Sequence, residues 1–142
     1  MRRGYSLIEL AVVLAVIGLV TAITLPRLAD LLDSLAVERA AADLTTALAV
    51  ARNAAVMHAS RSKLGISTDS LRIDRWDADG WRPLRHVPGA GDLGVTATVS
   101  NPVIVFGPLG IGWGASNTRV VLKRGAHSAT ITTSRIGRVK RW

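Results

Sequence analysis

The amino-acid sequence predicts an α+β fold in which one long N-terminal helix packs on a mostly antiparallel sheet. Three observations support this prediction. Residues 10–25 contain no charged side chain. Residues 28–61 repeat apolar side chains at steps of three and four, which is the period of an amphipathic helix. From residue 62 onward the apolar period changes to two, and glycines and prolines interrupt it as they do between short strands.

Length and composition limit the classes of function. The 142 residues suit one globular domain with an appendage. The chain has no cysteine, which excludes a disulfide framework, a thiolate metal site and a cysteine nucleophile. Its 18 Lys and Arg against 10 Asp and Glu give a formal net charge of +8. This balance favours contact with phosphate backbones, anionic lipid headgroups or an acidic partner, or it is simply a solvated surface.

The first element is an apolar segment long enough to cross a membrane. Residues 7–25 would form a helix of roughly 28 Å, which is close to a hydrocarbon core of about 30 Å. A secretory signal peptide would be followed by a small-x-small cleavage site, which residues 26–30 do not provide. A buried core helix of this apolarity is rare in so small a domain. We therefore expect residues 5–27 to be a retained transmembrane helix whose amino end, after Arg2 and Arg3, faces the cytoplasm.

Glu9 is an ionisable residue near the start of this apolar span. A charged side chain costs up to roughly 3 kcal/mol at the bilayer centre and less near an edge, so Glu9 calls for a cationic partner. The nearest candidate is a free amino terminus at Tyr5, which would exist if the chain were cut after Gly4. Alternatively, the Glu9 carboxylate reaches up to the headgroups without a partner.

The residues Gly4–Leu10 (GYSLIEL), followed by an apolar run, resemble the prepilin methylation motif of type IV pilins and type II secretion pseudopilins. In that family a prepilin peptidase cuts after the glycine and methylates the new amino terminus. The resemblance therefore implies a leader of residues 1–4, cleavage between Gly4 and Tyr5, and methylation of Tyr5. The residue after the cut is usually phenylalanine, so Tyr5 is a mild departure from the family pattern.

The same resemblance assigns roles to Glu9, Gly18 and Pro26, which all fall at the family's spacing. Glu9 would pair with the amino terminus of a neighbouring subunit and so set the register of assembly, a role in which buried ion pairs are well attested. Gly18 and Pro26 would allow a kink, because Pro26 lacks an N–H and crowds the carbonyl of Ala22. The implied partners are other pilin-like subunits, the prepilin peptidase and the bacterial inner membrane, with the head on its outer side in a pilus or pseudopilus.

Residues 28–61 are predicted to be the amphipathic half of the same helix. The repeating apolar positions are Leu28, Leu31, Leu32, Leu35, Leu44, Leu48, Ala51 and Ala55. A heptad coiled coil has a similar period, but the abundance of alanines favours close packing on a sheet.

Residues 62–142 are predicted to be a β-rich head with a basic C-terminal tail. The expected strands are residues 63–67, 71–76, 81–85, 94–99, 103–106, 119–123 and 128–132, with turns at residues 77–80 and 124–127. The glycine-rich residues 107–114 lack the Lys and Ser/Thr spacing of a phosphate-binding loop and are expected to be a structural turn. The head resembles the GspH/FimT subfamily in its turn Asp79-Gly80-Trp81, its segment Phe106–Gly110 and its Gly-Arg-Val ending.

The sequence shows no constellation typical of catalysis or of a metal site. His58, His86 and His127 are isolated from other ligand-type residues. Three aspartates lie close together at Asp74–Asp79, but arginines flank them and no calcium loop follows. We therefore expect a protein that is not an enzyme and that has no cofactor or metal.

The basic C-terminal tail is the one candidate for binding DNA. The residues considered for this role are Lys123, Arg124, Arg135, Arg138, Lys140, Arg141 and Trp142. In an extended chain Arg138 and Lys140 fall on one face and could contact phosphates about 7 Å apart, while Trp142 could stack on a base. The tail resembles the Gly-Arg-x-Arg tail with which FimT-like minor pilins bind DNA, although Lys140 replaces the second arginine. The alternatives are a plain terminal strand or a contact with acidic neighbours or headgroups.

Two functions of different classes follow. The first is a structural one, a GspH-like minor pseudopilin of a type II secretion system. The second is a binding function, a FimT-like minor pilin that captures DNA for natural transformation. The sequence does not decide between these machines.

Overall fold

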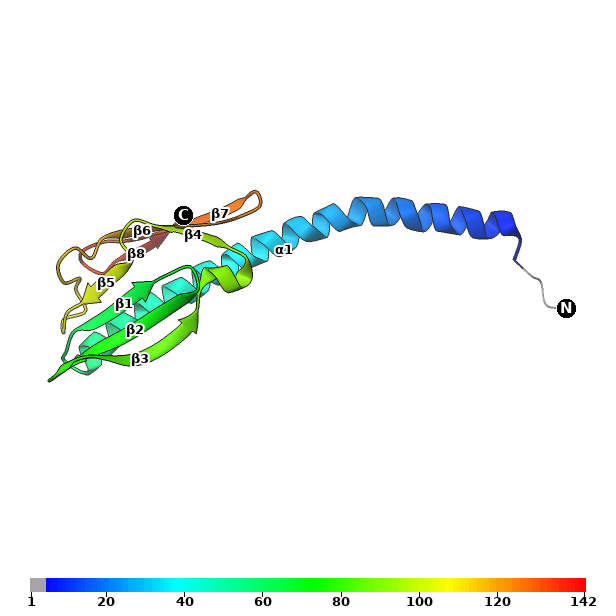
Figure 1. Ribbon diagram of the computed structural model, residues 1–142. Helices are drawn as coiled ribbons and strands as arrows, with labels where there is room; N and C mark the ends of the chain where they lie inside the picture. The colour runs from blue at the N-terminus through cyan, green and yellow to red at the C-terminus, as the bar shows by residue number, and fades with distance from the viewer. Residues whose placement is uncertain (1–4) are drawn as a thin grey trace. The chain divides into compact units, whose positions relative to one another are not determined.

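The computed structural model describes residues 5–142, and the leader expected at residues 1–4 lies outside them. The chain divides into two compact units, which meet between Leu32 and Asp33. One helix, α1 (Leu7–Met57), belongs to both units and includes Pro26 in its interior (Figure 1). The prediction of a single long N-terminal helix is confirmed.

The helix ends at Met57, not near Arg61 as the sequence predicted. The amide of Ala59 donates to the carbonyl of Val56, and the amide of Ser60 donates to the carbonyl of Ala55. These two bonds form a Schellman motif, in which the residue after the helix takes the left-handed conformation. Ala59 occupies that position with a φ of 45°. Because this reversal occurs within one turn of Met57, the helix cannot continue to residue 61.

Unit 33–142 contains two antiparallel four-stranded sheets (Figure 1). The first sheet has the order β3-β2-β1-β5, with β1 (Ser62–Ile66), β2 (Ser70–Asp77), β3 (Gly80–Pro88) and β5 (Val103–Phe106). The second has the order β4-β6-β7-β8, with β4 (Thr96–Val99), β6 (Thr118–Arg124), β7 (His127–Thr133) and β8 (Val139–Arg141). A short 3-10 helix, η1 (Ala90–Leu93), precedes β4. The antiparallel prediction is confirmed, whereas the division into two sheets was not predicted.

The core of unit 33–142 forms where the alanine-rich face of α1 meets both sheets. Ala41, Ala51 and Ala55 are completely buried, as are Leu64 and Ile131 on the sheets. Small side chains bring the helix backbone close to the strands, so the expectation that the alanines favour packing on a sheet is confirmed. Buried residues on α1 begin at Val37 and continue to Ala55: Val37, Ala40, Ala41, Leu44, Ala47, Leu48, Ala51, Ala54 and Ala55.

The predicted apolar stripe of residues 28–61 is therefore buried only in its second part. Leu44, Leu48, Ala51 and Ala55 lie in the core, whereas the four leucines that precede Val37 are about half exposed: Leu28, Leu31, Leu32 and Leu35. In unit 33–142 the earliest helix residue with a side-chain bond to a strand is Asp33, which contacts β6. The leucine stripe before Val37 is thus a surface that the described part of this chain leaves uncovered.

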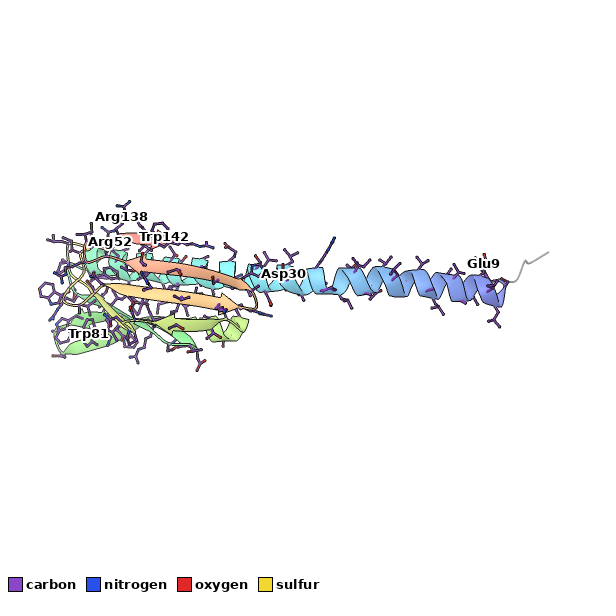
Figure 2. The ribbon with its side chains drawn as sticks, turned by 90° about the horizontal axis from the view of Figure 1, so that it is seen from above. Glu9, Asp30, Arg52, Trp81, Arg138 and Trp142 are labelled. Atoms are coloured by element: carbon purple, nitrogen blue, oxygen red, sulfur yellow. The ribbon has the colours of Figure 1, made fainter. Side chains whose placement is uncertain are left out.

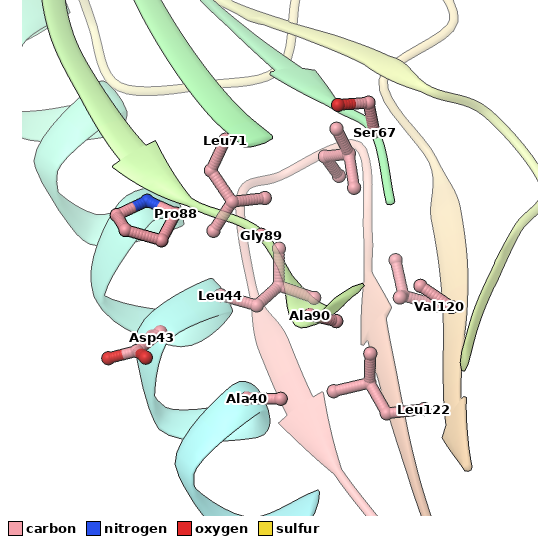
Figure 3. Close-up of a pocket in the computed structure, with 12 residues that line it drawn as sticks. Ala40, Asp43, Leu44, Ser67, Leu71, Pro88, Gly89, Ala90, Val120 and Leu122 are labelled. Carbon is pink, nitrogen blue, oxygen red and sulfur yellow. The ribbon is translucent and has the colours of Figure 1, made fainter. Parts of the chain in front are cut away.

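A small cavity lies between α1 and both sheets (Figure 3). Ala40 and Leu44 border it on the helix, and Val120 and Leu122 border it on β6. Its volume is about 10 Å³, which is at the lower limit for a single water molecule. Since its lining is almost entirely apolar, the cavity is a packing gap and not a ligand site.

Candidate functional site

The start of α1 combines a helix cap with the carboxylate of Glu9. The amide of Glu9 donates to the hydroxyl oxygen of Ser6 at 3.2 Å. Ser6 and Glu9 therefore stand at the N-cap and third helical positions, which is the Ser-x-x-Glu pattern of a capping box. The signal for this cap is visible in the sequence as Ser6-Leu7-Ile8-Glu9, but it was not among the predicted features. A carboxylate in the first turn is also favoured by the partial positive charge of the helix N-terminus.

The apolar segment of the first unit presents its side chains outward. Residues 5–32 are all exposed in the chain, and the segment is long and apolar enough to cross a membrane. Within residues 10–25 the two polar side chains are satisfied internally, because the hydroxyls of Thr21 and Thr24 donate to the carbonyls of Ile17 and Val20, each at 2.8 Å. A segment with satisfied polar groups and uncovered apolar ones suits lipid or the helices of neighbouring subunits.

The other N-terminal positions are placed as follows. Tyr5 is 77% exposed and precedes the first helical residue, Leu7. Gly4, the predicted cleavage residue, lies outside the described residues. The helix is continuous through Gly18 and Pro26. A Cβ at Gly18 would meet nothing within 4 Å, so the small side chain is not required by packing within this chain. The kink at Gly18 and Pro26 stays a prediction.

Two of the candidate DNA-binding cations, Arg124 and Arg141, form ion pairs with acidic residues of α1. The Nε of Arg124 lies 2.7 Å from a carboxylate oxygen of Asp33, and Arg124 also donates to the carbonyl of Leu93. Arg141 forms an ion pair with Glu38. Both arginines therefore hold the second sheet to the helix, which leaves them poorly placed to bind an external anion.

The remaining candidate cations are exposed, and the tail itself is strand β8. Its register pairs Lys140 with Thr132 and Arg141 with Ile131 of β7. Because Ile131 is in the core, Arg141 faces α1 and Lys140 faces solvent. The ammonium group of Lys140 lies 5.3 Å from the ring centroid of Trp142. Further exposed positions are Lys123, Arg135, Arg138 and Trp142, of which Arg138 and Trp142 are labelled in Figure 2.

The cluster of aspartates at residues 74–79 is compensated by basic side chains. Asp74 is 2% exposed and lies 3.2 Å from Lys63 Nζ and 2.8 Å from Arg72 Nε. Asp77 contacts Arg75 and Arg82. Within residues 5–142 no group of three or more His, Cys, Asp or Glu side chains could hold a metal ion. His58 contacts Arg75 through its Nδ1 atom at 3.1 Å.

Residues 1–25 match the family model described as the prokaryotic N-terminal methylation motif. No sequence among the curated proteins matches the chain. Among solved structures, the type IV minor pilin FimU of Pseudomonas aeruginosa PAO1 aligns with a TM-score of 0.62 at 20% identity, covering 73% of this chain and 86% of FimU.

The fold is pilin-like. A second solved structure supports this, the minor pseudopilin EpsH from the type 2 secretion system of Vibrio cholerae. It aligns with a TM-score of 0.60 at 13% identity and covers 75% of this chain and 95% of EpsH. These identities establish a shared fold. One neighbour is a minor pilin and the other a minor pseudopilin, so the pilin-like fold serves in both kinds of machine.

Proposed function

We propose that this chain is a minor subunit of a filament built on the inner membrane, specifically a GspH-like minor pseudopilin of a type II secretion system. The observation that supports this most strongly is the N-terminal segment. The exposed apolar helix has Glu9 in its first turn, residues 1–25 match the methylation motif, and the fold of the head is pilin-like. We propose a structural role in protein secretion and not an enzymatic one.

Assembly would use the charge pair implied by the motif. Cleavage after Gly4 gives Tyr5 a free amino group, and this cation would meet the Glu9 carboxylate of a neighbouring subunit within the membrane. Each subunit then neutralises a charge that its neighbour would otherwise bury unpaired. Sliding one helix along its axis against the next would separate the two charges, so the pair fixes the register between subunits. Arg2 and Arg3 would keep the amino end on the cytoplasmic side and direct the head outward.

The processing step is tested by expressing the full chain together with a prepilin peptidase and measuring the mass of the mature protein. We expect the loss of residues 1–4 and the gain of one methyl group on Tyr5. A Gly4→Val variant should remain uncut. A mature chain that keeps residues 1–4 in the presence of an active peptidase would contradict the proposal.

The pairing of Glu9 is tested separately, by chemical crosslinking of the mature chain with its filament partners in membranes. Glu9→Gln should be processed normally but should lose most of the crosslinked product, because the neutral amide cannot compensate the amino terminus. Glu9→Asp, which keeps the charge, serves as the matched control. Equal crosslinking by the Gln variant and the wild type would exclude the pair.

A second candidate function is DNA capture for natural transformation, as in FimT-like minor pilins. The observation that favours it is the solvent exposure of Arg138 and Lys140, together with the exposed indole of Trp142 beside Lys140. Deletion of the gene distinguishes the two candidates. Loss of extracellular enzymes supports the secretion function, and loss of transformability with intact secretion supports DNA capture.

A further inference from the structure

Charge is segregated along this chain. All 10 Asp and Glu residues lie within residues 1–92, so residues 93–142 contain no carboxylate side chain. The same 50 residues contain seven cations: Arg119, Lys123, Arg124, Arg135, Arg138, Lys140 and Arg141. Every strand of the second sheet comes from this acid-free part of the sequence. Any carboxylate that compensates the sheet must therefore come from another element.

That compensation reaches only one face of the second sheet. Arg124 and Arg141 lie on the face toward α1, where they meet Asp33 and Glu38. The opposite face, which we call the outer face, is defined by the register of the strands. Arg119 of β6 pairs with Thr132 of β7, which pairs with Lys140 of β8.

The outer face carries cations at both of its ends and hydroxyls between them. Lys123 pairs with Ser128 of β7 and Thr96 of β4. Arg119 and Lys140 are separated by two strand spacings, or about 10 Å, and Arg119 and Lys123 by about 14 Å along β6. Arg138 continues the register of Lys140, because Ser134 and Arg138 are hydrogen-bonded to each other just before β8. Among residues 5–142, the outer-face cations Arg119, Lys123, Arg138 and Lys140 form no ion pair with a carboxylate side chain. The face thus has uncompensated positive charge.

The chemistry of the outer face fits a phosphate backbone better than an acidic protein. Protein interfaces usually have an apolar centre, but no large apolar side chain of β4, β6 or β7 is exposed. Apart from the half-buried Val121, the side chains between the cations are threonine and serine hydroxyls of β4 and β7, and these groups donate to phosphate oxygens as arginine and lysine do. The cation spacings of about 10 and 14 Å lie on either side of the width of the major groove of a DNA duplex, which is about 12 Å. At the edge of the face, the indole of Trp142 is 73% exposed.

We infer that the nucleic-acid-binding surface of this chain is the whole outer face of the second sheet, so that Arg119 and Lys123 of β6 bind the DNA backbone together with Arg138 and Lys140. The inference rests on DNA capture, the second candidate function above. It adds Arg119, which lies 19 positions before Arg138 in the sequence and joins the tail only through strand pairing. It also assigns Arg124 and Arg141 to the attachment of the sheet and not to DNA.

The test measures binding of fluorescent DNA to the full chain in nanodiscs of neutral lipid, by anisotropy across a salt series. The variants are Arg119→Gln/Lys123→Gln and Arg138→Gln/Lys140→Gln. Arg82→Gln/Arg85→Gln on β3 is the matched control, since it removes the same charge from an exposed strand of the first sheet. Tryptophan fluorescence verifies that each variant is folded. A duplex and a single strand are both used as probes.

We expect each outer-face double variant to weaken binding about tenfold and to lower the slope of log Kd against log salt by about 2, one for each phosphate contact. The control should bind as the wild type does. Binding by Arg119→Gln/Lys123→Gln that equals the wild type would overturn the inference while the tail function stands. No binding of DNA by the wild-type chain would overturn both the outer-face inference and the DNA-capture function. The filament proposal would still be decided by the mass of the mature protein after processing. Equal competition by polyglutamate at the same charge concentration would also overturn the assignment to DNA.

Discussion

At the scale of single residues, Ala59 is the position where local backbone strain is most evident. It has the only positive φ among the described non-glycine residues, at 45°, and it closes the Schellman motif that ends α1. A left-handed conformation costs a residue with a Cβ about 1–2 kcal/mol, because the Cβ crowds the following carbonyl oxygen. The motif is retained because Ser60 and Ser62 are fixed nearby by bonds from their hydroxyls to Trp76 and Ala51.

We therefore predict that Ala59→Gly stabilises the head by about 1 kcal/mol, since glycine adopts this φ without steric cost. The change is measured as the denaturant midpoint of tryptophan fluorescence, because three of the four tryptophans belong to the first sheet and the loop beside it. The same substitution at Ala49, an exposed position inside α1, should destabilise by about 1 kcal/mol. A shift of the same sign at both positions would contradict the explanation.

Asp74 is a second residue whose surroundings predict a measurable effect. Its carboxylate is buried and accepts from Lys63 and Arg72. Asp74→Asn should destabilise the head by about 2 kcal/mol, which is less than a fully buried pair would cost because both cations can regain water. Asp79→Asn is the matched control, since Asp79 is 89% exposed and 4.0 Å from Arg82. We expect its denaturation midpoint to be unchanged, and equal effects at the two aspartates would show that burial is not the cause.

At the scale of elements, the second sheet is tied to α1 by Asp33–Arg124 and Glu38–Arg141. The Asp33–Arg124 pair is about one-third exposed on both sides, and Arg124 also bonds the carbonyl of Leu93. It should contribute more than a helix-surface pair such as Arg39–Asp43, whose arginine is 71% exposed. The Asp33–Arg124 pair is therefore expected to stabilise the packing of the second sheet on α1.

A double-mutant cycle of Asp33→Ala and Arg124→Ala measures this attachment. We predict a coupling energy of about 1 kcal/mol, against about 0.3 kcal/mol for the same cycle on Arg39 and Asp43. The measurement is the free energy of unfolding of the four chains in each cycle. Coupling that is no larger for Asp33–Arg124 than for Arg39–Asp43 would mean that packing of the apolar core alone fastens the sheet.

The sequence predicted those helices and strands whose formation depends on residues close together in the chain. The alternation of residues 103–106 predicted β5 without error, because each side chain's face is set by its own neighbours. The division of the strands into two sheets depends on pairing between segments far apart in sequence, which no local period encodes. For the same reason the sequence placed Arg124 and Arg138 in one basic group, whereas the register and the bond to Asp33 separate them.

At the scale of the whole molecule, the two compact units differ in how much apolar surface they expose to water. The side chains of residues 5–32 are exposed and mostly apolar, whereas residues 33–142 enclose a core of their own. The first unit therefore exposes apolar surface that lipid, detergent or other subunits can cover, whereas the second unit buries most of its large apolar side chains within itself. The division at Asp33 also coincides with the first of the two ion pairs that hold the second sheet.

We therefore predict that a chain beginning at Asp33 folds as a soluble monomer without detergent, while the full chain requires detergent or lipid. A second chain that begins at Arg39 keeps most of the buried alanine face but loses Asp33, Glu38 and the packing of Val37. It should be less stable by about 2–4 kcal/mol, of which burial of Val37 supplies roughly half. Gel filtration and the denaturant midpoint of tryptophan fluorescence measure the two effects. If the chain from Asp33 aggregates, the head needs the apolar segment in order to fold; if both chains are equally stable, the two ion pairs and Val37 contribute nothing to the attachment of the second sheet.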